Sequence, residues 1–237
     1  MKVKAVMEYN EGGYLIYLED FVGAYVRGRS REEALAKMDS EIRQYLSWAG
    51  GEAQLFGLPF EPEIVQTKKS ALNVSDADSD VIFDSEKTPL TAEEYASLKK
   101  LAMKSAEDFL CLYDSVPDKL GTALSPRKTF YGDVPITAEQ MYAHTKNVNS
   151  YYFSEIGVRA SNEPDIAACR EAGFSMLEAI PGFLENKVFD GSYNEQWSLR
   201  KVCRRFVWHD RIHAKAMFRM AAKLCGRENI QNPFRFL

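Results

Sequence analysis

The 237-residue sequence contains only three histidines and four cysteines, and it lacks a long uninterrupted apolar stretch. The cysteines lie far apart, which argues against a zinc knuckle, a redox pair or a disulfide framework. No apolar run approaches the ~18–20 residues that a membrane-spanning helix requires. The N-terminus lacks the apolar core and the cleavage site of a signal peptide. These absences predict a soluble, cytoplasmic protein without a membrane partner.

Several sequence motifs that would identify a reaction or a cofactor are also absent. The sequence has no serine-histidine-aspartate order of a hydrolase, no phosphate-binding glycine loop and no dinucleotide fingerprint. What is present is an ordinary globular composition, with 46% hydrophobic and 27% charged residues and a formal net charge of −4. The chain as a whole is therefore no polycation built to coat nucleic acid.

The charge is unevenly distributed along the chain. Residues 1–70 carry a net charge of −2 and residues 71–196 a net charge of −10, whereas residues 197–227 carry +8. Two interpretations of this basic segment remain open: a solvated helix face paired with acidic neighbours, or a surface for an anion or RNA. The segment lacks interleaved exposed aromatic residues and an RNA-binding signature, so we favour the solvated face and expect no nucleic-acid partner.

The first 70 residues predict a small sheet covered by one helix. Short apolar segments separated by turn signals are typical of strands. The predicted strands are residues 3–9, 14–18, 22–28 and 62–67. Before the last strand, Ser30 and Glu33 form a capping box, and apolar residues at helical spacing follow until Gly50 and Gly51 end the helix. The predicted order is β-β-β-α-β.

Three stretches of this segment resemble the HicB-like family. They are Gly13-Tyr14 at a strand entry, residues 19–23 (Glu-Asp-Phe-Val-Gly) and residues 28–34 (Gly-Arg-Ser-Arg-Glu-Glu-Ala). The family has an acidic residue, a short step to glycine, a strand and then Gly-x-Ser/Thr-x-Glu-Glu-Ala. The resemblance implies a partial RNase-H-like fold. It also implies a protein partner, since HicB-like antitoxins bind and mask a small toxic RNase.

The rest of the chain divides into a connector and a helical region. Residues 71–90 form a polar, acidic linker, in which residues 81–83 (Val-Ile-Phe) are expected to add an edge strand or to pack onto a neighbour. Capping boxes and apolar periodicity then predict four helices. They cover residues 91–113, 137–152, 162–180 and 197–226. The predicted fold class is α+β, with a HicB-like domain at 1–70, the linker at 71–90 and an all-α region at 91–237.

All three histidines lie on apolar stripes of predicted helices. His209 and His213 are four residues apart, so their side chains stack on one helix face one turn apart. His144 comes from another helix and can supply a third nitrogen. Three protein ligands leave a coordination position for water or substrate, the layout of a catalytic metal site. The alternative is three core histidines satisfied by neighbours, at a desolvation cost of roughly 1–3 kcal/mol for each unmade hydrogen bond.

The helical region also resembles the DinB-like metal-binding four-helix bundle. That family carries one histidine in its second helix and a His-x-x-x-His pair in its fourth helix, often shortly after a tryptophan. The matching residues are His144 after the Thr137 cap, then Trp197, His209 and His213. The resemblance implies a divalent transition metal, either Zn²⁺, Ni²⁺ or Fe²⁺, held by the three histidines.

The resemblance further implies a thiol-dependent transferase or a metal-dependent hydrolase acting on a small thiol or another small molecule. Asp210 and Glu139 are candidates to orient the ligands, and four aromatic residues either line a pocket or, as is more usual at helical spacing, belong to the core. The four are Tyr142, Tyr151, Tyr152 and Trp208. The alternative function is a non-enzymatic regulatory protein, in which the HicB-like module recognises a protein partner. Bundles of this type often pair, which is compatible with a homodimer.

Overall fold

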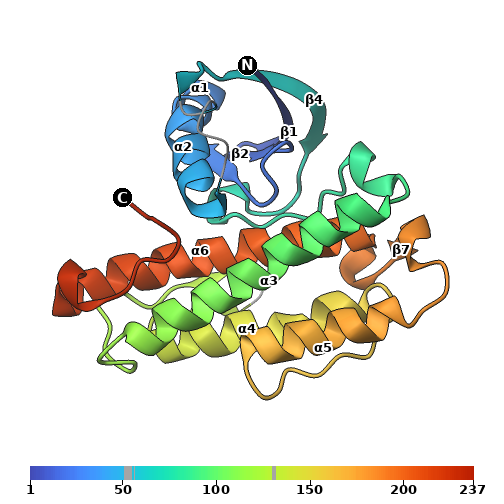
Figure 1. Cartoon of the computed structure of the whole chain (residues 1–237). Helices are drawn as coiled ribbons and strands as arrows, with labels where there is room; N and C mark the ends of the chain where they lie inside the picture. Colours follow the sequence, from blue (N-terminus) through green and yellow to red (C-terminus); the bar gives the residue numbers. More distant parts are fainter. Residues whose placement is uncertain (51–54, 56, 130–131) are drawn as a thin grey trace.

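A computed structural model of the chain describes residues 1–50, 55, 57–129 and 132–237. An N-terminal mixed sheet is followed by a helical C-terminal region, so the predicted α+β class is confirmed (Figure 1). The sheet module lies along one side of the last long helix, and the other long helices lie along its opposite side. Within the described residues, no helix combines the length and the apolar character that a bilayer crossing requires.

The N-terminal sheet has the strand order β3-β2-β1-β4. Its strands are β1 (Lys2–Asn10), β2 (Gly13–Leu18), β3 (Tyr25–Gly28) and β4 (Glu61–Lys69). β1 runs antiparallel to β2 and parallel to β4, because the helical segment between β3 and β4 returns the chain to the other edge. The β-β-β-α-β order predicted from the sequence is thus present, although two boundaries differ.

The first difference concerns the helix, which is divided into α1 (Arg31–Leu35) and α2 (Met38–Ala49). Ser30 caps α1 as predicted, and Gly50 ends α2 in the left-handed conformation at φ 80°. The predicted contribution of Gly51 lies outside the described residues. The second difference is that β3 begins only at Tyr25, because the chain from Leu18 to Ala24 forms hydrogen-bonded turns instead of extended strand.

Both faces of the sheet are covered. On one face, Val3 and Ala5 join the large core to which α2 contributes Ile42. On the other face, Val6, Leu15 and Tyr17 pack against Phe83 of the connector and Trp208 of the last helix. β2 reads as a nearly continuous apolar run because its alternating side chains are buried in both directions.

The helical region contains four long helices. They are α3 (Ala92–Ser115), α4 (Ala138–Ser154), α5 (Ile166–Glu178) and α6 (Leu199–Cys225). α6 packs against α3 and α4, and α5 packs against the same two helices. Short strand pairs and 3-10 turns fill the connections. The strands are β5 (Lys128–Thr129), β6 (Gly132–Asp133), β7 (Phe189–Asp190) and β8 (Gln196–Trp197), and the connector holds η2 (Val74–Asp76) and η3 (Asp84–Lys87).

Some residues predicted to face the core are exposed. α5 starts at Ile166 behind the Asp165 cap, later than predicted, and it ends before Pro181. The apolar periodicity of residues 162–180 predicts Met176 and Ile180 on the inward face, yet they are 48% and 40% exposed, because α5 buries only the face that meets α3 and α4. Leu224, in the last turn of α6, is 43% exposed.

The basic helix α6 is not a solvated surface over its first half, which corrects the favoured interpretation of its charge. Every residue from Lys201 to Arg211 is buried, since the sheet module and the connector cover the face that the other helices leave open. Each buried cation has an acidic or carbonyl partner. The pairs are Lys201–Glu195 at 2.9 Å, Arg204–Glu86 at 2.5 Å, Arg211–Glu41 at 2.7 Å, and Arg205 Nη1 to the Ser79 carbonyl oxygen at 2.9 Å.

The connector is part of the core, and its apolar residues do not add a strand. Val81 and Phe83 are buried, and Phe83 lies under the guanidinium group of Arg204 at 3.9 Å from the ring centroid. The sheet module approaches α6 closely at Gly23, where a Cβ would lie 2.5 Å from a methyl group of Val207. Glycine is required there both for this contact and for its φ of 84°.

Candidate metal centre

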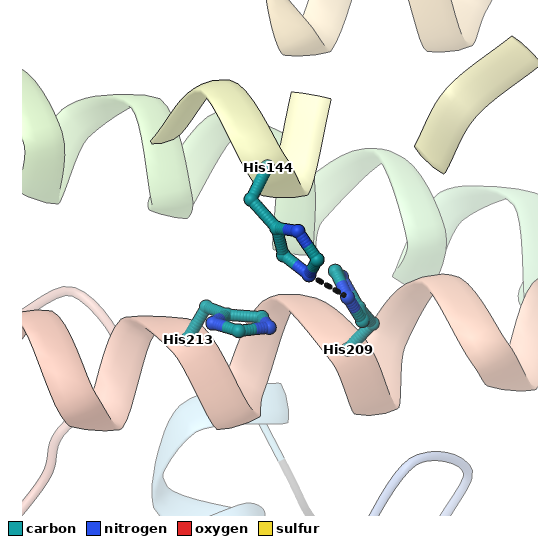
Figure 2. Close-up of side chains that lie close together, drawn as sticks. All are labelled: His144, His209 and His213. Atoms are coloured by element: carbon teal, nitrogen blue, oxygen red, sulfur yellow. Dashed lines mark hydrogen bonds between the residues drawn. The ribbon is translucent and has the colours of Figure 1, made fainter. Parts of the chain in front are cut away.

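Two helices carry the three histidines into one place. Thr137 caps α4 by accepting a hydrogen bond from the Gln140 amide, which fixes the start of the helix two turns before His144. Ser198 caps α6 in the same way. His209 and His213 lie one turn apart on α6 and face the same side as a consequence of the helical repeat. Figure 2 shows the imidazole of His144 pointing from α4 toward this pair.

The three imidazoles converge, as the predicted site requires. One ligand atom from each of His144, His209 and His213 lies within 4.8 Å of the other two. The Nε2 atoms of His144 and His209 are 3.2 Å apart, and the ring centroids of the three residues are 4.5–5.0 Å from one another. Two nitrogens bound tetrahedrally to one zinc ion at ~2.0–2.1 Å lie roughly 3.3 Å apart, so the separation of the His144 and His209 nitrogens fits a shared ion. We call these residues the histidine cluster.

The surroundings keep the cluster neutral. Burial lowers the pKa of His213 to about 3, with further lowering by His144 and Arg127. Burial, followed by the nearby His213 and His144, holds the pKa of His209 well below its ordinary value. His144 is the most accessible of the three, and burial of its ring lowers its pKa as well. A neutral imidazole keeps the lone pair that a metal ion needs.

The cluster contains no carboxylate, and neither predicted orienting residue contacts it. Asp210 is fully buried and pairs with Arg170, with Nη1 to Oδ2 at 2.5 Å, and with Ser105 Oγ at 2.5 Å. Glu139 accepts a hydrogen bond from the Tyr113 hydroxyl group at the surface. Among the described residues, the buried Nδ1 atom of His209 has no hydrogen-bond partner.

A cavity of about 390 Å³ opens beside the histidine cluster. Three of the four predicted aromatic residues, Tyr151, Tyr152 and Trp208, line it. Tyr142 does not, because its ring stacks on Tyr113 with 4.1 Å between centroids, away from the cavity. The volume lies within the ~300–1,000 Å³ that is usual for small-molecule sites.

Other walls of the cavity were missed in the sequence. The connector contributes Asp76 and Asp78, and the loop before α4 contributes Arg127 and Pro135. An ion pair joins the two segments, with Arg127 Nη1 2.5 Å from Asp76 Oδ1. Arg205, on the same helix as two of the histidines, also lines the cavity. The high density of acidic residues in the connector was the only signal, and it does not say which basic residue lies opposite.

Comparison with known proteins adds no relative from which a role can be taken. No family model matches the sequence, and neither a curated protein nor a solved structure is similar to it at the level required for a match. The structure by itself gives a geometric arrangement: three neutral imidazoles from two helices meet at the edge of a cavity of small-molecule size.

Proposed function

We propose that His144, His209 and His213 hold one divalent transition metal ion, and that the chain is a DinB-like metalloprotein acting as a thiol-dependent transferase or a metal-dependent hydrolase. The observation that carries the proposal is the convergence of the three ligand atoms within 4.8 Å. Zn²⁺, Ni²⁺ and Fe²⁺ all accept imidazole ligands. The alternative of three core histidines is less well supported, since the His209 Nδ1 atom has no partner among the described residues.

The donor set fits a metal ion on chemical grounds. Two imidazole nitrogens 3.2 Å apart repel each other when both present lone pairs or when both are protonated, and a cation bound by both lone pairs removes that repulsion. Three protein ligands leave at least one position open. A bound divalent ion supplies Lewis acidity, lowering the pKa of a thiol or water that binds at that position.

The residues of the chain provide the remaining functions of a substrate site. Tyr151 and Trp208 offer flat apolar walls next to the histidine cluster, which exclude water from the reacting group. The Arg205 guanidinium group lies 4.7 Å from the Trp208 ring centroid, and it places a positive charge in the cavity wall. A cation at this position stabilises negative charge on a bound substrate.

Elemental analysis of the purified protein tests the proposal. We expect about one transition-metal ion per chain, as for a three-ligand catalytic site. His213→Ala should lose most of this metal. Ile212→Ala is the matched control, because Ile212 is the neighbouring residue and lines the same cavity without offering a ligand; this variant should retain the ion.

A protein that takes up none of Zn²⁺, Ni²⁺ and Fe²⁺, or a His213→Ala variant that binds metal as the parent does, would contradict the proposal. The reaction class is then tested with Co²⁺-loaded protein and a panel of small thiols, in which thiol binding changes the visible spectrum of the ion. A protein that binds the metal but turns over neither thiols nor esters and amides would favour the regulatory alternative, which a pull-down through the sheet module would test.

A further inference from the structure

A second and larger hollow lies between the sheet module and the helical region. This groove has a volume of about 800 Å³. β3 and α2 contribute one wall, α6 contributes the opposite wall, and the loop before α4 closes one end. Tyr25 and Glu41 belong to the first wall, while His213 and Arg219 belong to the second. The groove therefore exists only because the two parts of the chain are packed together.

The groove adjoins the cavity beside the histidine cluster. His213, Ile212, Arg127 and Asp76 line both spaces, so the Asp76–Arg127 ion pair and one of the three imidazoles lie where they meet. On the floor, the Tyr25 ring of the groove meets the Trp208 ring of the cavity edge-on, with 6.2 Å between centroids. A molecule lying in the groove can thus reach the histidine cluster at His213 without passing through the core.

Positive charge dominates the groove. Five of its lining side chains are cationic and two are acidic. The cations are Arg27, Lys37, Arg127, Lys215 and Arg219, and the acids are Glu41 and Asp76. Asp76 pairs with Arg127, Lys37 pairs with Glu33 outside the groove, and Glu41 is shared between Lys215, at 3.7 Å, and the buried Arg211. Arg219 is exposed and has no acidic partner among the described residues.

The excess positive charge lies at a defined distance from the histidine cluster. Arg219 is six residues after His213 on α6, which separates their backbones by about 9 Å along the helix axis. We propose that the groove is the substrate entrance of the histidine cluster, and that it selects a small molecule carrying negative charge about 9 Å from the atom that reaches His213. The N-terminal module thereby forms one wall of the substrate site. The proposal takes the position of the reacting end from the metal centre proposed above, but the charge preference does not need the metal.

Two isosteric peptides test the charge preference. Acetyl-Cys-Gly-Glu-Glu-amide places its acidic residues two and three positions, or roughly 7–10 Å along the extended backbone, beyond the cysteine, and acetyl-Cys-Gly-Gln-Gln-amide has the same shape without charge. Binding of each peptide, labelled with a fluorophore, is followed by anisotropy. We expect the acidic peptide to bind at least about tenfold more tightly at low ionic strength, and this ratio should shrink as salt screens the charges.

Arg219→Glu should remove or invert the preference. The matched control is Arg159→Glu, which makes the same change of charge at an exposed position outside the groove and should retain the preference.

Measurement with the metal-free His213→Ala variant separates the groove proposal from the metal-site proposal. An acidic-peptide preference that survives in this variant supports the groove even if no metal binds. Equal affinity for the two peptides in the parent protein, or equal effects of the two arginine substitutions, would overturn it. Tighter binding of a single-stranded oligonucleotide than of the acidic peptide would also overturn it.

Discussion

Helix α6 carries two kinds of buried polar cluster. One consists of paired charges that stabilise the fold, and the other consists of the histidines that can bind a metal ion. Along its first half, each buried charge has a partner that is an opposite charge or a carbonyl oxygen: Arg204 pairs with Glu86, and Asp210 with Arg170. In the histidine cluster the polar atoms face one another, and His209 Nδ1 has no partner among the described residues. A buried polar atom without a partner costs stability, so a chain that keeps an imidazole at this position gains something other than stability from it.

The largest expected effect comes from breaking one of the buried ion pairs of α6. Asp210→Ala leaves the fully buried Arg170 guanidinium group without its counter-charge, and this should lower the free energy of unfolding by about 3–5 kcal/mol. Urea denaturation measures the change. The control is Asp39→Ala, which removes the exposed partner of Arg43 on α2 and should cost less than ~1 kcal/mol. Similar losses in the two variants would show that burial of the Arg170–Asp210 pair does not set its importance.

Glu8 belongs to neither kind of cluster, and its burial predicts that the stability of the protein depends on pH. Burial raises the pKa of this β1 carboxyl group to about 7, and Asp80 adds to the rise, while the Ser79 hydrogen bond and Lys68 oppose it. Between the ordinary pKa of 4.5 and about 7, the folded protein binds more protons than the unfolded chain, so stability falls as pH rises through this window. Relative to Glu8→Gln, the parent should lose up to roughly 3 kcal/mol between pH 5 and pH 8.

Urea denaturation at the two pH values checks this expectation. Glu63→Gln is the matched control, because Glu63 is an exposed glutamate on the neighbouring strand β4. This variant should show the same pH dependence as the parent. If Glu8→Gln also follows the parent, the carboxyl group of Glu8 does not change its protonation state on folding in this pH range.

The third prediction concerns the stabilisation that a metal ion adds to the unpaired cluster. A ligand that binds only the folded chain raises the free energy of unfolding by about 2.7 kcal/mol when its free concentration is a hundred times the dissociation constant. We expect thermal denaturation to show this gain with the native metal, and a chelator to reverse it. His144→Ala should abolish the gain, whereas Tyr142→Phe should keep it, because Tyr142 faces away from the cavity. A gain that persists in His144→Ala would place the ion elsewhere.

The sequence allowed the histidine cluster to be predicted, but not its surroundings, and the reason is physical. The Thr137 and Ser198 caps and the four-residue spacing of His209 and His213 are local features, which fix the side of each helix that the imidazoles occupy. The Asp76–Arg127 pair joins residues 51 positions apart, and no local pattern specifies it. The charges of α6 were also misread, because a helix face covered by another module has the same periodicity as a face covered by water.

The smallest expected effect is a gain in stability, and it tests directly whether the histidine cluster differs from the paired charges of α6. His209→Leu, measured with a chelator present, replaces an imidazole whose Nδ1 atom has no partner among the described residues by an apolar side chain that fits among Tyr152 and Phe206. Removing an unsatisfied polar group from a buried position should leave the free energy of unfolding unchanged or raise it by about 1 kcal/mol. Urea denaturation of the metal-free proteins measures the difference. A decrease in the free energy of unfolding larger than ~2 kcal/mol would mean that the imidazole is needed for packing, as core histidines are. The histidine cluster would then have the same stabilising role as the paired charges of α6. A gain, together with the loss of metal binding, would show that this position is kept polar at the expense of stability, which is the signature of a functional site.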